Sequence, residues 1–281
     1  MLEQTSRASG AVRVRQLQPA IGAEILGLDL REKLTEDHKQ LLREALLAHG
    51  VIFIPRQEIG EAEFLALGEV FGTLGGDEPG ELLGTLKSAG GAKDQSANVW
   101  HSDGCYLQHP PPATLLRALQ ASPLGGDTCF SSAVAAYEGL PEDLKARIRP
   151  LRYRSSFAFI ISRYMRFTSP TKQTEKADRL GVVEQPVVRV HPETGALVLY
   201  VNDSQTMDIV GLDPEEGAAL LRRLTDEIKR PEYQMRWKWS DGDIAIWDNR
   251  AVQHYGVPDQ VGDRIMQRVT VVDTQPAIQA A

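Results

Sequence analysis

Cysteine is scarce in this chain, and long apolar stretches are absent from it. The 281 residues include two cysteines, Cys105 and Cys129, which are too few for a disulfide framework. No run of about 18 apolar residues occurs, and no apolar segment follows a basic start, so we expect neither a membrane span nor a signal peptide. The expectation is therefore a cytoplasmic protein with no membrane partner.

An excess of positive charge is also missing. The formal net charge is −7, with 31 Lys and Arg against 38 Asp and Glu. No nucleic-acid partner is expected, because duplex binders normally carry a basic face. No Pro-, Gly- or Ser-rich linker, repeat or low-complexity block divides the chain. We therefore expect one domain over residues 11–281, preceded by a disordered terminus at 1–10.

Hydrophobic periodicity predicts both helices and strands. A helix is expected over Glu36–His49, because Thr35 is a suitable N-cap and Gly50 follows the last residue. This mixture predicts a mainly β fold with flanking helices, in the α+β class. The other expected elements are helices at 61–71 and 213–229 and strands at 51–54, 196–201, 234–239 and 268–272.

A histidine and an aspartate, His101 and Asp103, lie two residues apart with Ser102 between them. On a strand such residues point to the same side, so the side chains of His101 and Asp103 would converge while Ser102 faces away. A further histidine, His254, stands far downstream. Two neutral imidazoles and one carboxylate suit non-haem Fe(II) and leave positions open for a co-substrate and O₂. The three side chains are therefore a candidate iron site.

This spacing of histidine and aspartate also occurs by chance in many chains. The chain contains six histidines, however, and the other four have structural explanations. His38 and His49 belong to the helix expected at 36–49. His191 opens a His-Pro-Glu-Thr-Gly turn, and His109 precedes three prolines in an expected loop. The scarcity of histidine favours the metal-site interpretation.

Groups that could hold a carboxylate accompany this candidate site. Thr128 ends the segment Gly125-Gly126-Asp127-Thr128, and Arg264 and Arg268 follow His254. A guanidinium binds a carboxylate through two charge-assisted hydrogen bonds, and a threonine hydroxyl adds one donor. These residues predict a socket for the far end of a keto acid that chelates the iron.

The ordered set of motifs resembles the Fe(II)/2-oxoglutarate-dependent dioxygenases of the taurine dioxygenase and 2,4-dichlorophenoxyacetate dioxygenase group. The resemblance covers nearly the whole chain. Besides the residues above, it is carried by the segments Gly22–Leu30, Val187–Gly195 and Asp243–Asn249. It implies a double-stranded β-helix, which is a cupin-like jelly-roll core, and a homo-oligomer.

The resemblance also implies a role for each matching residue. His101, Asp103 and His254 would bind Fe(II), and Thr128 and Arg264 would bind the distal carboxylate of 2-oxoglutarate. The implied reaction hydroxylates a substrate with O₂ and converts 2-oxoglutarate to succinate and CO₂. These activities make the chain an expected oxidoreductase.

Two arginines compete for the carboxylate of 2-oxoglutarate. Nine residues separate His254 from Arg264 and thirteen separate it from Arg268. The number of residues after His254 favours Arg268, whereas the local run Arg-Ile-Met-x-Arg favours Arg264. We take Arg264 as the co-substrate residue and Arg268, on the same strand face, as the candidate for the substrate anion. The reverse assignment stays open.

The resemblance suggests a small anionic substrate, such as an alkyl sulfate, a sulfonate or an aryloxy acid. Taurine is not expected, because the histidine and tyrosine that taurine dioxygenase carries after its second helix are missing here. A second hypothesis keeps the iron chemistry but takes an amino acid or a natural-product intermediate, whose amine would meet Asp77 or Glu78. The candidate substrate contacts are Arg268, Gln205, Asp77 and either Ala97 or Asn98.

A basic segment interrupts this acidic chain. Residues 152–179 contain seven Lys and Arg side chains against Glu175 and Asp178. The simpler interpretation is a solvated amphipathic surface. The functional interpretation is a lid insertion around 152–185, whose charge would favour anions and whose aromatic residues would line the site. Those aromatic residues are Phe157, Phe159 and Tyr164.

Proteins of two other classes could use the same three ligands. A jelly-roll binding protein could hold a structural metal, but it would have no reason to keep Thr128 and Arg264 as a carboxylate socket. A zinc hydrolase could use two histidines and an aspartate with one open position. The identity of the metal and the dependence on a keto acid distinguish these alternatives.

Overall fold

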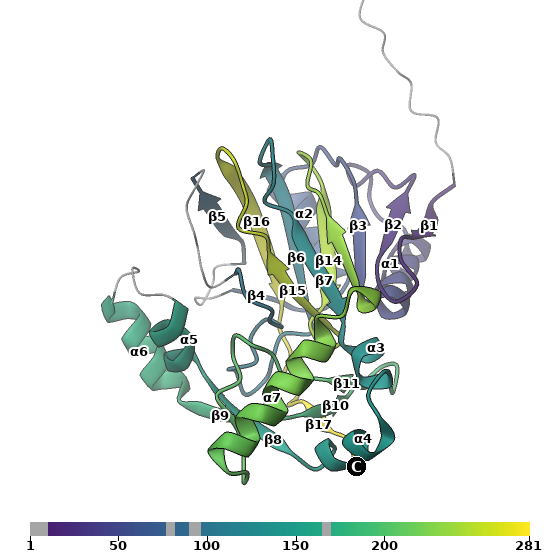
Figure 1. The fold of residues 1–281 in the computed structure, drawn as a ribbon. Coiled ribbons are helices and arrows are strands. Elements are labelled where there is room, and N and C mark those ends of the chain that lie inside the picture. The colour runs from purple at the N-terminus through teal and green to yellow at the C-terminus, as the bar shows by residue number, and fades with distance from the viewer. Residues whose placement is uncertain (1–10, 77–81, 90–96, 165–169) are drawn as a thin grey trace, which may run out of the picture.

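The computed structural model describes residues 11–76, 82–89, 97–164 and 170–281. The longest strands gather in the upper part of the molecule, and helices flank them (Figure 1). The terminus at residues 1–10, predicted to be disordered, lies outside the described residues. Within the described part of the chain, no helix is long and apolar enough to cross a membrane.

The larger sheet is the framework on which the other elements pack. Its strands run in the order β1-β2-β3-β14-β6-β16-β4, and β5 pairs with β16. The pairings are antiparallel except that of β2 with β3. The strand bounds are Arg13–Gln16 (β1), Ala23–Leu26 (β2), Val51–Ile54 (β3), Leu74–Gly75 (β4), Gly84–Ser88 (β5), Ala113–Gln120 (β6), Ile244–Asp248 (β14) and Arg264–Val271 (β16).

A smaller antiparallel sheet faces the larger one. Phe53 of β3 stacks on Trp237 with ring centroids 4.0 Å apart, and it meets Phe130 edge to face at 5.6 Å. A buried apolar cluster fills the space between the sheets. The mainly β fold with flanking helices is confirmed, and the facing sheets agree with the expected jelly-roll core. The smaller sheet has the order β13 (Gln234–Trp237), β7 (Thr128–Ser132) and β15 (Val252–Gly256).

Helices α1 (Glu36–His49) and α2 (Glu61–Glu69) cover the outer face of the larger sheet. They bury Leu42, Leu46 and Phe64 in one cluster with side chains of the sheet. Burial of a large apolar side chain contributes about 1.5–3 kcal/mol, so this amphipathic face explains why the helices stay on the sheet.

Local signals fix the ends of α1 where the sequence predicts them. Thr35 Oγ1 accepts a hydrogen bond from the His38 amide at 3.2 Å, which satisfies one of the free N–H groups of the first turn. Gly50 ends the helix with a φ of 71°, and its amide donates to the Leu46 carbonyl. Helix α2 ends at Glu69, two residues before its predicted end.

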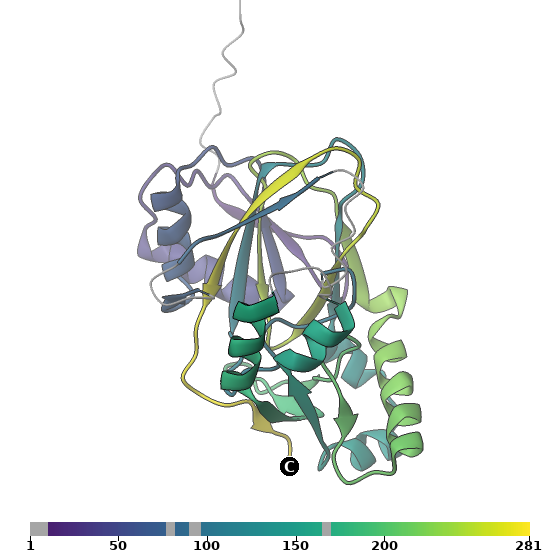
Figure 2. The same cartoon turned by 90° about the vertical axis from the view of Figure 1, so that its left-hand side faces the viewer.

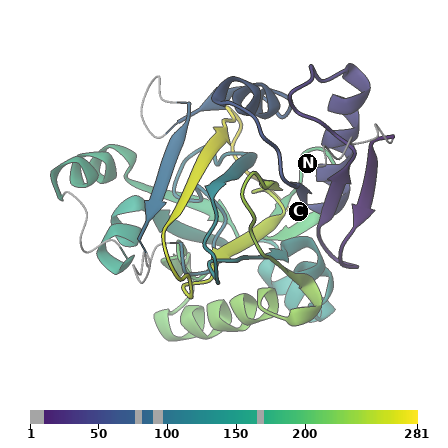
Figure 3. The same ribbon diagram turned by 90° about the horizontal axis from the view of Figure 1, so that it is seen from above.

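The lower part of the molecule contains two small sheets and the remaining helices (Figure 1). Helix α7 buries apolar side chains in this part and lies across the strands from α1 and α2 (Figure 3). The sheets have the orders β12-β8-β9 and β11-β10-β17. The bounds are Ala133–Glu138 (α3), Glu142–Ile148 (α4), Arg152–Ser156 (β8), Val182–Pro186 (β9), Val188–Val190 (β10), Leu197–Leu199 (β11), Asp208–Ile209 (β12), Pro214–Ile228 (α7), Pro231–Tyr233 (η1) and Ile278–Gln279 (β17).

The segment predicted as a lid forms part of this lower region. It runs from β8 through α5 (Phe157–Tyr164) and α6 (Pro170–Leu180) to β9. Helices α5 and α6 lie side by side, as Figure 2 shows.

The predicted strands are present, but their ends differ from the prediction. β16 begins at Arg264 rather than Arg268, because β5 pairs with its first half over residues 264–268. β13 ends at Trp237 rather than at residue 239. Strand ends depend on the partner strand, which the local sequence does not contain.

Candidate active site

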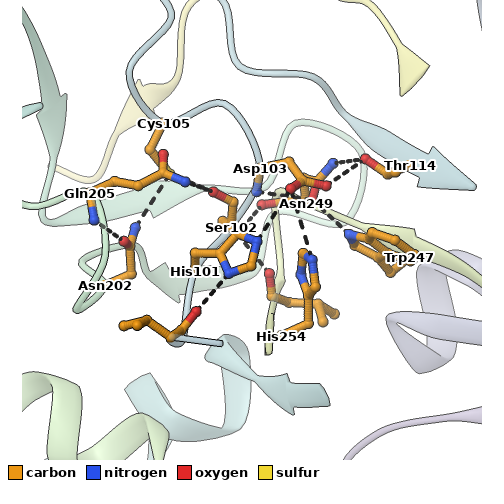
Figure 4. A network of polar contacts seen from close by, with 12 residues as sticks. His101, Ser102, Asp103, Cys105, Thr114, Asn202, Gln205, Trp247, Asn249 and His254 are labelled. Carbon is orange, nitrogen blue, oxygen red and sulfur yellow. Dashed lines mark hydrogen bonds and ion pairs between the residues drawn. The ribbon is translucent and has the colours of Figure 1, made fainter. Parts of the chain in front are cut away.

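The side chains of His101, Asp103 and His254 meet beside β15. His101 forms an antiparallel bridge with His254, in which each backbone N–H donates to the other residue's carbonyl, at 3.1 and 2.8 Å. Asp103 Oδ1 lies 3.6 Å from His101 Nε2 and 3.8 Å from His254 Nε2 (Figure 4). One potential ligand atom from each residue lies within 4.8 Å of the other two. The structure therefore brings these three side chains together.

A turn, rather than the predicted strand, presents Asp103. The chain turns at Gly104, whose φ of +68° is readily adopted by glycine. Ser102 nevertheless faces away from the site, as expected. Its hydroxyl oxygen lies 2.8 Å from the Asn249 carbonyl oxygen and 2.6 Å from that of Val252. These contacts tie the turn to the segment that leads to the downstream histidine.

The protonation states in this cluster suit a metal cation. His101 Nδ1 lies 2.7 Å from the Val99 carbonyl oxygen, which can only accept, so Nδ1 carries a proton and donates it there. Burial, together with the neighbouring His101, lowers the pKa of His254 to about 3, so this ring is neutral at pH 7. Burial alone would raise the pKa of Asp103, but His254, His101 and Arg268 lower it below its usual range. Two neutral imidazoles and a carboxylate are a donor set that fits Fe(II).

Thr128 and Arg264 both lie at the segment 126–128. Arg264 Nη1 donates to the Gly126 carbonyl at 2.9 Å, and burial lowers the pKa of its guanidinium. Thr128 is buried at the start of β7, where its hydroxyl accepts a hydrogen bond from Trp239 Nε1 at 3.0 Å. A guanidinium and a hydroxyl in this arrangement are suitable donors for a carboxylate.

Arg268 and Arg264 lie in different surroundings, although both are on β16. It lines a cavity of about 280 Å³ together with His101 and Asp103, whereas Arg264 is not among the described residues that line it. The two arginines are four residues apart on β16, which is about 13 Å at roughly 3.3 Å per residue. The positive charge of Arg268 lies close enough to Asp103 to lower the pKa of that carboxyl group.

The cavity is lined by the positively charged Arg268 side chain and by apolar side chains. Phe157 and Ile160 reach it from α5, in the segment predicted as a lid. The Tyr106 ring packs against that of Phe157 with centroids 5.0 Å apart. A ligand with an anionic end and an apolar body would match this lining. The apolar lining residues include Leu86, Tyr106, Leu107, Phe157, Ile160 and Val272.

Part of the basic charge of the predicted lid is used in ion pairs. Arg154 makes two hydrogen bonds to the Asp208 carboxylate, at 2.8 and 2.6 Å. Arg152 Nε lies 3.4 Å from Glu184 Oε2. Exposed pairs of this kind contribute little stability, and they reduce the charge that this segment offers to an anion.

The other predicted substrate contacts lie in different places. Gln205 and Ala97 line the cavity. Asn98 is not among the described lining residues. Asp77 and Glu78 lie outside the described residues.

Three residues at the site are missing from the sequence-based prediction. His109, expected only in a loop, lines the cavity. The Thr114 hydroxyl lies 2.8 Å from Asp103 Oδ2, and the Asn249 amide lies 2.8 Å from the Thr114 hydroxyl. Asn249 ends one of the motifs that carry the resemblance, which is a usable signal. No local pattern marks Thr114 or His109.

Comparison with known proteins identifies the class to which this chain belongs. The family model "Taurine catabolism dioxygenase TauD, TfdA family" matches residues 13–270. The chain therefore belongs to this family, and it is a 2-oxoglutarate-dependent dioxygenase, an oxidoreductase that uses 2-oxoglutarate and O₂. The resemblance inferred from the sequence motifs is confirmed.

Individual relatives of known activity refine this comparison. The chain is 33% identical to an alkylsulfatase of Acinetobacter baylyi, over 92% of this chain and 84% of the relative. It is also 33% identical to an alpha-ketoglutarate-dependent sulfate ester dioxygenase of Pseudomonas putida, over 91% and 88%. The structure is similar to a putative alpha-ketoglutarate-dependent taurine dioxygenase from Burkholderia xenovorans, with a TM-score of 0.81, 33% identity, and coverage of 96% of this chain and 99% of the other.

Proposed function

We propose that this protein binds Fe(II) through His101, Asp103 and His254 and hydroxylates a small organic anion. The observation that carries the proposal is the position of Arg268, which lines one apolar-walled cavity together with His101 and Asp103. A substrate anion held by Arg268 would have its apolar part next to His101 and Asp103. Fe(II), when bound there, supplies the activation of O₂, which is coupled to conversion of 2-oxoglutarate to succinate and CO₂.

We assign Thr128 and Arg264 to the distal carboxylate of 2-oxoglutarate. Both offer donors at the segment 126–128, and Arg264 is half-buried, which strengthens its attraction for an anion. Arg268 lies on the cavity side instead, which supports its assignment to the substrate. The count of residues after His254 favoured Arg268 for the co-substrate, and the different surroundings of the two arginines support the assignment based on the local motif.

The substrate that best matches the cavity has one anionic group and an apolar body, as alkyl sulfates, sulfonates and aryloxy acids have. The two relatives that act on sulfate esters, by their names, support the first of these. Hydroxylation of the carbon that bears a sulfate ester oxygen gives a product that breaks down to an aldehyde and inorganic sulfate. The cavity walls, rather than Fe(II), would decide which apolar body is accepted.

An anaerobic titration tests the metal and co-substrate assignments. The Fe(II)-loaded protein is titrated with 2-oxoglutarate, and the weak visible charge-transfer band of the chelated keto acid is recorded for the wild type and for His101→Ala. A band in the wild type alone supports the proposal, and substrate-dependent succinate release then ranks alkyl sulfates, alkyl sulfonates and aryloxy acids. A wild type without the band contradicts the proposal and favours a structural metal site or a zinc hydrolase.

Two further expectations from the sequence stay predictions. We propose a homo-oligomer, which light scattering coupled to size-exclusion chromatography measures directly. We also propose a cytoplasmic location, which cell fractionation tests. A monomer at all concentrations would contradict the first expectation without affecting the metal site.

A further inference from the structure

A network of hydrogen bonds links Trp247, Asn249 and Thr114 to Asp103. Asn249 Oδ1 accepts from Trp247 Nε1 at 2.9 Å and from the Asp103 backbone N–H at 3.3 Å. Asn249 Nδ2 lies 2.8 Å from Thr114 Oγ1, which in turn lies 2.8 Å from Asp103 Oδ2 (Figure 4). None of these contacts has a role in the activity described so far.

The groups at the two ends of this hydrogen-bond network determine the direction of every hydrogen bond in it. The indole N–H of Trp247 and the backbone N–H of Asp103 can only donate, so the oxygen of the Asn249 amide must face them. The amide nitrogen therefore donates to the Thr114 hydroxyl. This hydroxyl gives its own proton to Asp103 Oδ2, because an ionised carboxylate can only accept.

The residues of this hydrogen-bond network are shielded from water and belong to, or lie next to, strands of the larger sheet. Thr114 is fully buried and Asn249 has 1% of its surface exposed, so solvent cannot easily replace either group. Thr114 lies within β6, where it pairs with Trp247 of β14 on one side and with Thr270 of β16 on the other. The hydroxyl that reaches Asp103 is therefore held in place by the larger sheet.

The two oxygens of Asp103 consequently have different surroundings. Oδ2 accepts the Thr114 hydroxyl, whereas Oδ1 lies 3.6 and 3.8 Å from the Nε2 atoms of His101 and His254. Only Oδ1 is directed at the place between the imidazoles where a metal would bind. A carboxylate that used both oxygens would fill one more coordination position.

We propose that Thr114 and Asn249 are positioning residues that limit Asp103 to one metal-bound oxygen and so keep a coordination position free for O₂. The inference rests on the proposed metal site, because it concerns how Asp103 meets that metal. It assigns a function to the hydroxyl of Thr114 and to the amide orientation of Asn249. Partners of this kind, one step behind a metal ligand, typically change metal affinity by 10- to 100-fold when they are removed.

The decisive variant is Thr114→Val, which keeps the shape of the side chain and removes the hydroxyl. Mn(II) alone is the probe, and the relaxation rate of water protons reports the waters bound to it. Three protein ligand atoms leave three of six positions to water, so a second Asp103 oxygen would lower the inner-sphere relaxivity by about a third. We expect this decrease together with Mn(II) binding that is weaker by about 10-fold or more.

Two matched variants separate positioning from a general loss of structure. Thr114→Ser retains the hydroxyl, and we expect it to restore the wild-type relaxivity. Thr225→Val removes another buried hydroxyl, 3.3 Å from the Arg222 carbonyl in α7, and we expect wild-type values there. Thermal unfolding of each variant, measured without metal, shows whether a change at the metal accompanies a change in stability.

The possible outcomes have distinct meanings. Wild-type relaxivity in Thr114→Val overturns the inference while leaving the proposed metal site intact. A decrease that Thr114→Ser does not reverse also overturns it, because a hydroxyl at this position would then not suffice. A wild type that does not bind Mn(II) contradicts the proposed metal site, and the inference with it. Asn249→Ala is less informative, since it also leaves the Trp247 indole N–H without its acceptor.

Discussion

At the scale of single residues, the two arginines of β16 offer the sharpest test of the site. Arg264→Ala should raise the KM for 2-oxoglutarate by roughly 10- to 100-fold, because a charge-assisted contact contributes about 1.5–3 kcal/mol. Arg268→Ala should instead raise the KM for the organic anion and leave the KM for 2-oxoglutarate nearly unchanged. Steady-state kinetics with each ligand varied in turn distinguishes the two, and an exchange of these effects would reverse the assignment.

At the scale of elements, helix α5 decides how well the apolar part of a substrate fits. Phe157→Ala removes a ring that lines the cavity, so long-chain anions should lose about 10-fold or more in kcat/KM, whereas short-chain anions should change little. Phe159→Ala, on the same helix but not among the described lining residues, is the matched control. Equal losses for long and short chains, or equal losses in both variants, would contradict a role of α5 in selecting the substrate.

Asp248, the last residue of β14, should make the stability of the fold depend on pH. Buried Asp248 accepts hydrogen bonds from Arg250 and lies 3.0 Å from His191 Nε2; burial alone would raise its pKa, but these partners lower it to about 2. Because this carboxyl group has a lower pKa in the folded than in the unfolded chain, it stabilises the fold at pH values above its unfolded pKa near 3.8. This contribution is lost as the pH falls towards 2. It amounts to roughly 2 kcal/mol at 1.36 kcal/mol per unit.

Urea unfolding at several pH values measures this contribution. The free energy of unfolding of the wild type should exceed that of Asp248→Asn at pH 7, and the difference should shrink between pH 4 and pH 2. A constant difference between wild type and Asp248→Asn over the whole range would rule out the linkage.

At the scale of the whole molecule, the candidate metal site joins segments that are distant in sequence. A ligand that binds only the folded state adds about 2.7 kcal/mol at a concentration 100 times its Kd, which corresponds to about 5 °C or more in Tm for a chain of this size. Loading with Fe(II) under anaerobic conditions should therefore raise Tm, and a chelator should reverse the change. His101→Ala should abolish the increase and His38→Ala should retain it; an equal increase in both would contradict the assigned ligands.

Much of the local structure could be predicted from the sequence, because the interactions that decide it lie within a few residues. Helix α1 begins and ends where Thr35 and Gly50 predict, since a cap bonds to its own first or last turn. The closeness of His101 and Asp103 was also predicted, although a turn at Gly104 rather than a strand presents Asp103. Strand ends are predicted less well, as the early start of β16 at Arg264 shows, because they depend on partners elsewhere in the chain.

The sequence by itself determined the fold class, the family and the residue types of the candidate site. Only the tertiary structure decided that His101 pairs with His254 and that Arg268 rather than Arg264 lines the cavity. It alone brings the Thr114 hydroxyl to Asp103. The physical reason is the same in each case. Local hydrogen bonds and periodicity depend on residues that are close in sequence, whereas contacts across a sheet depend on strand order and register.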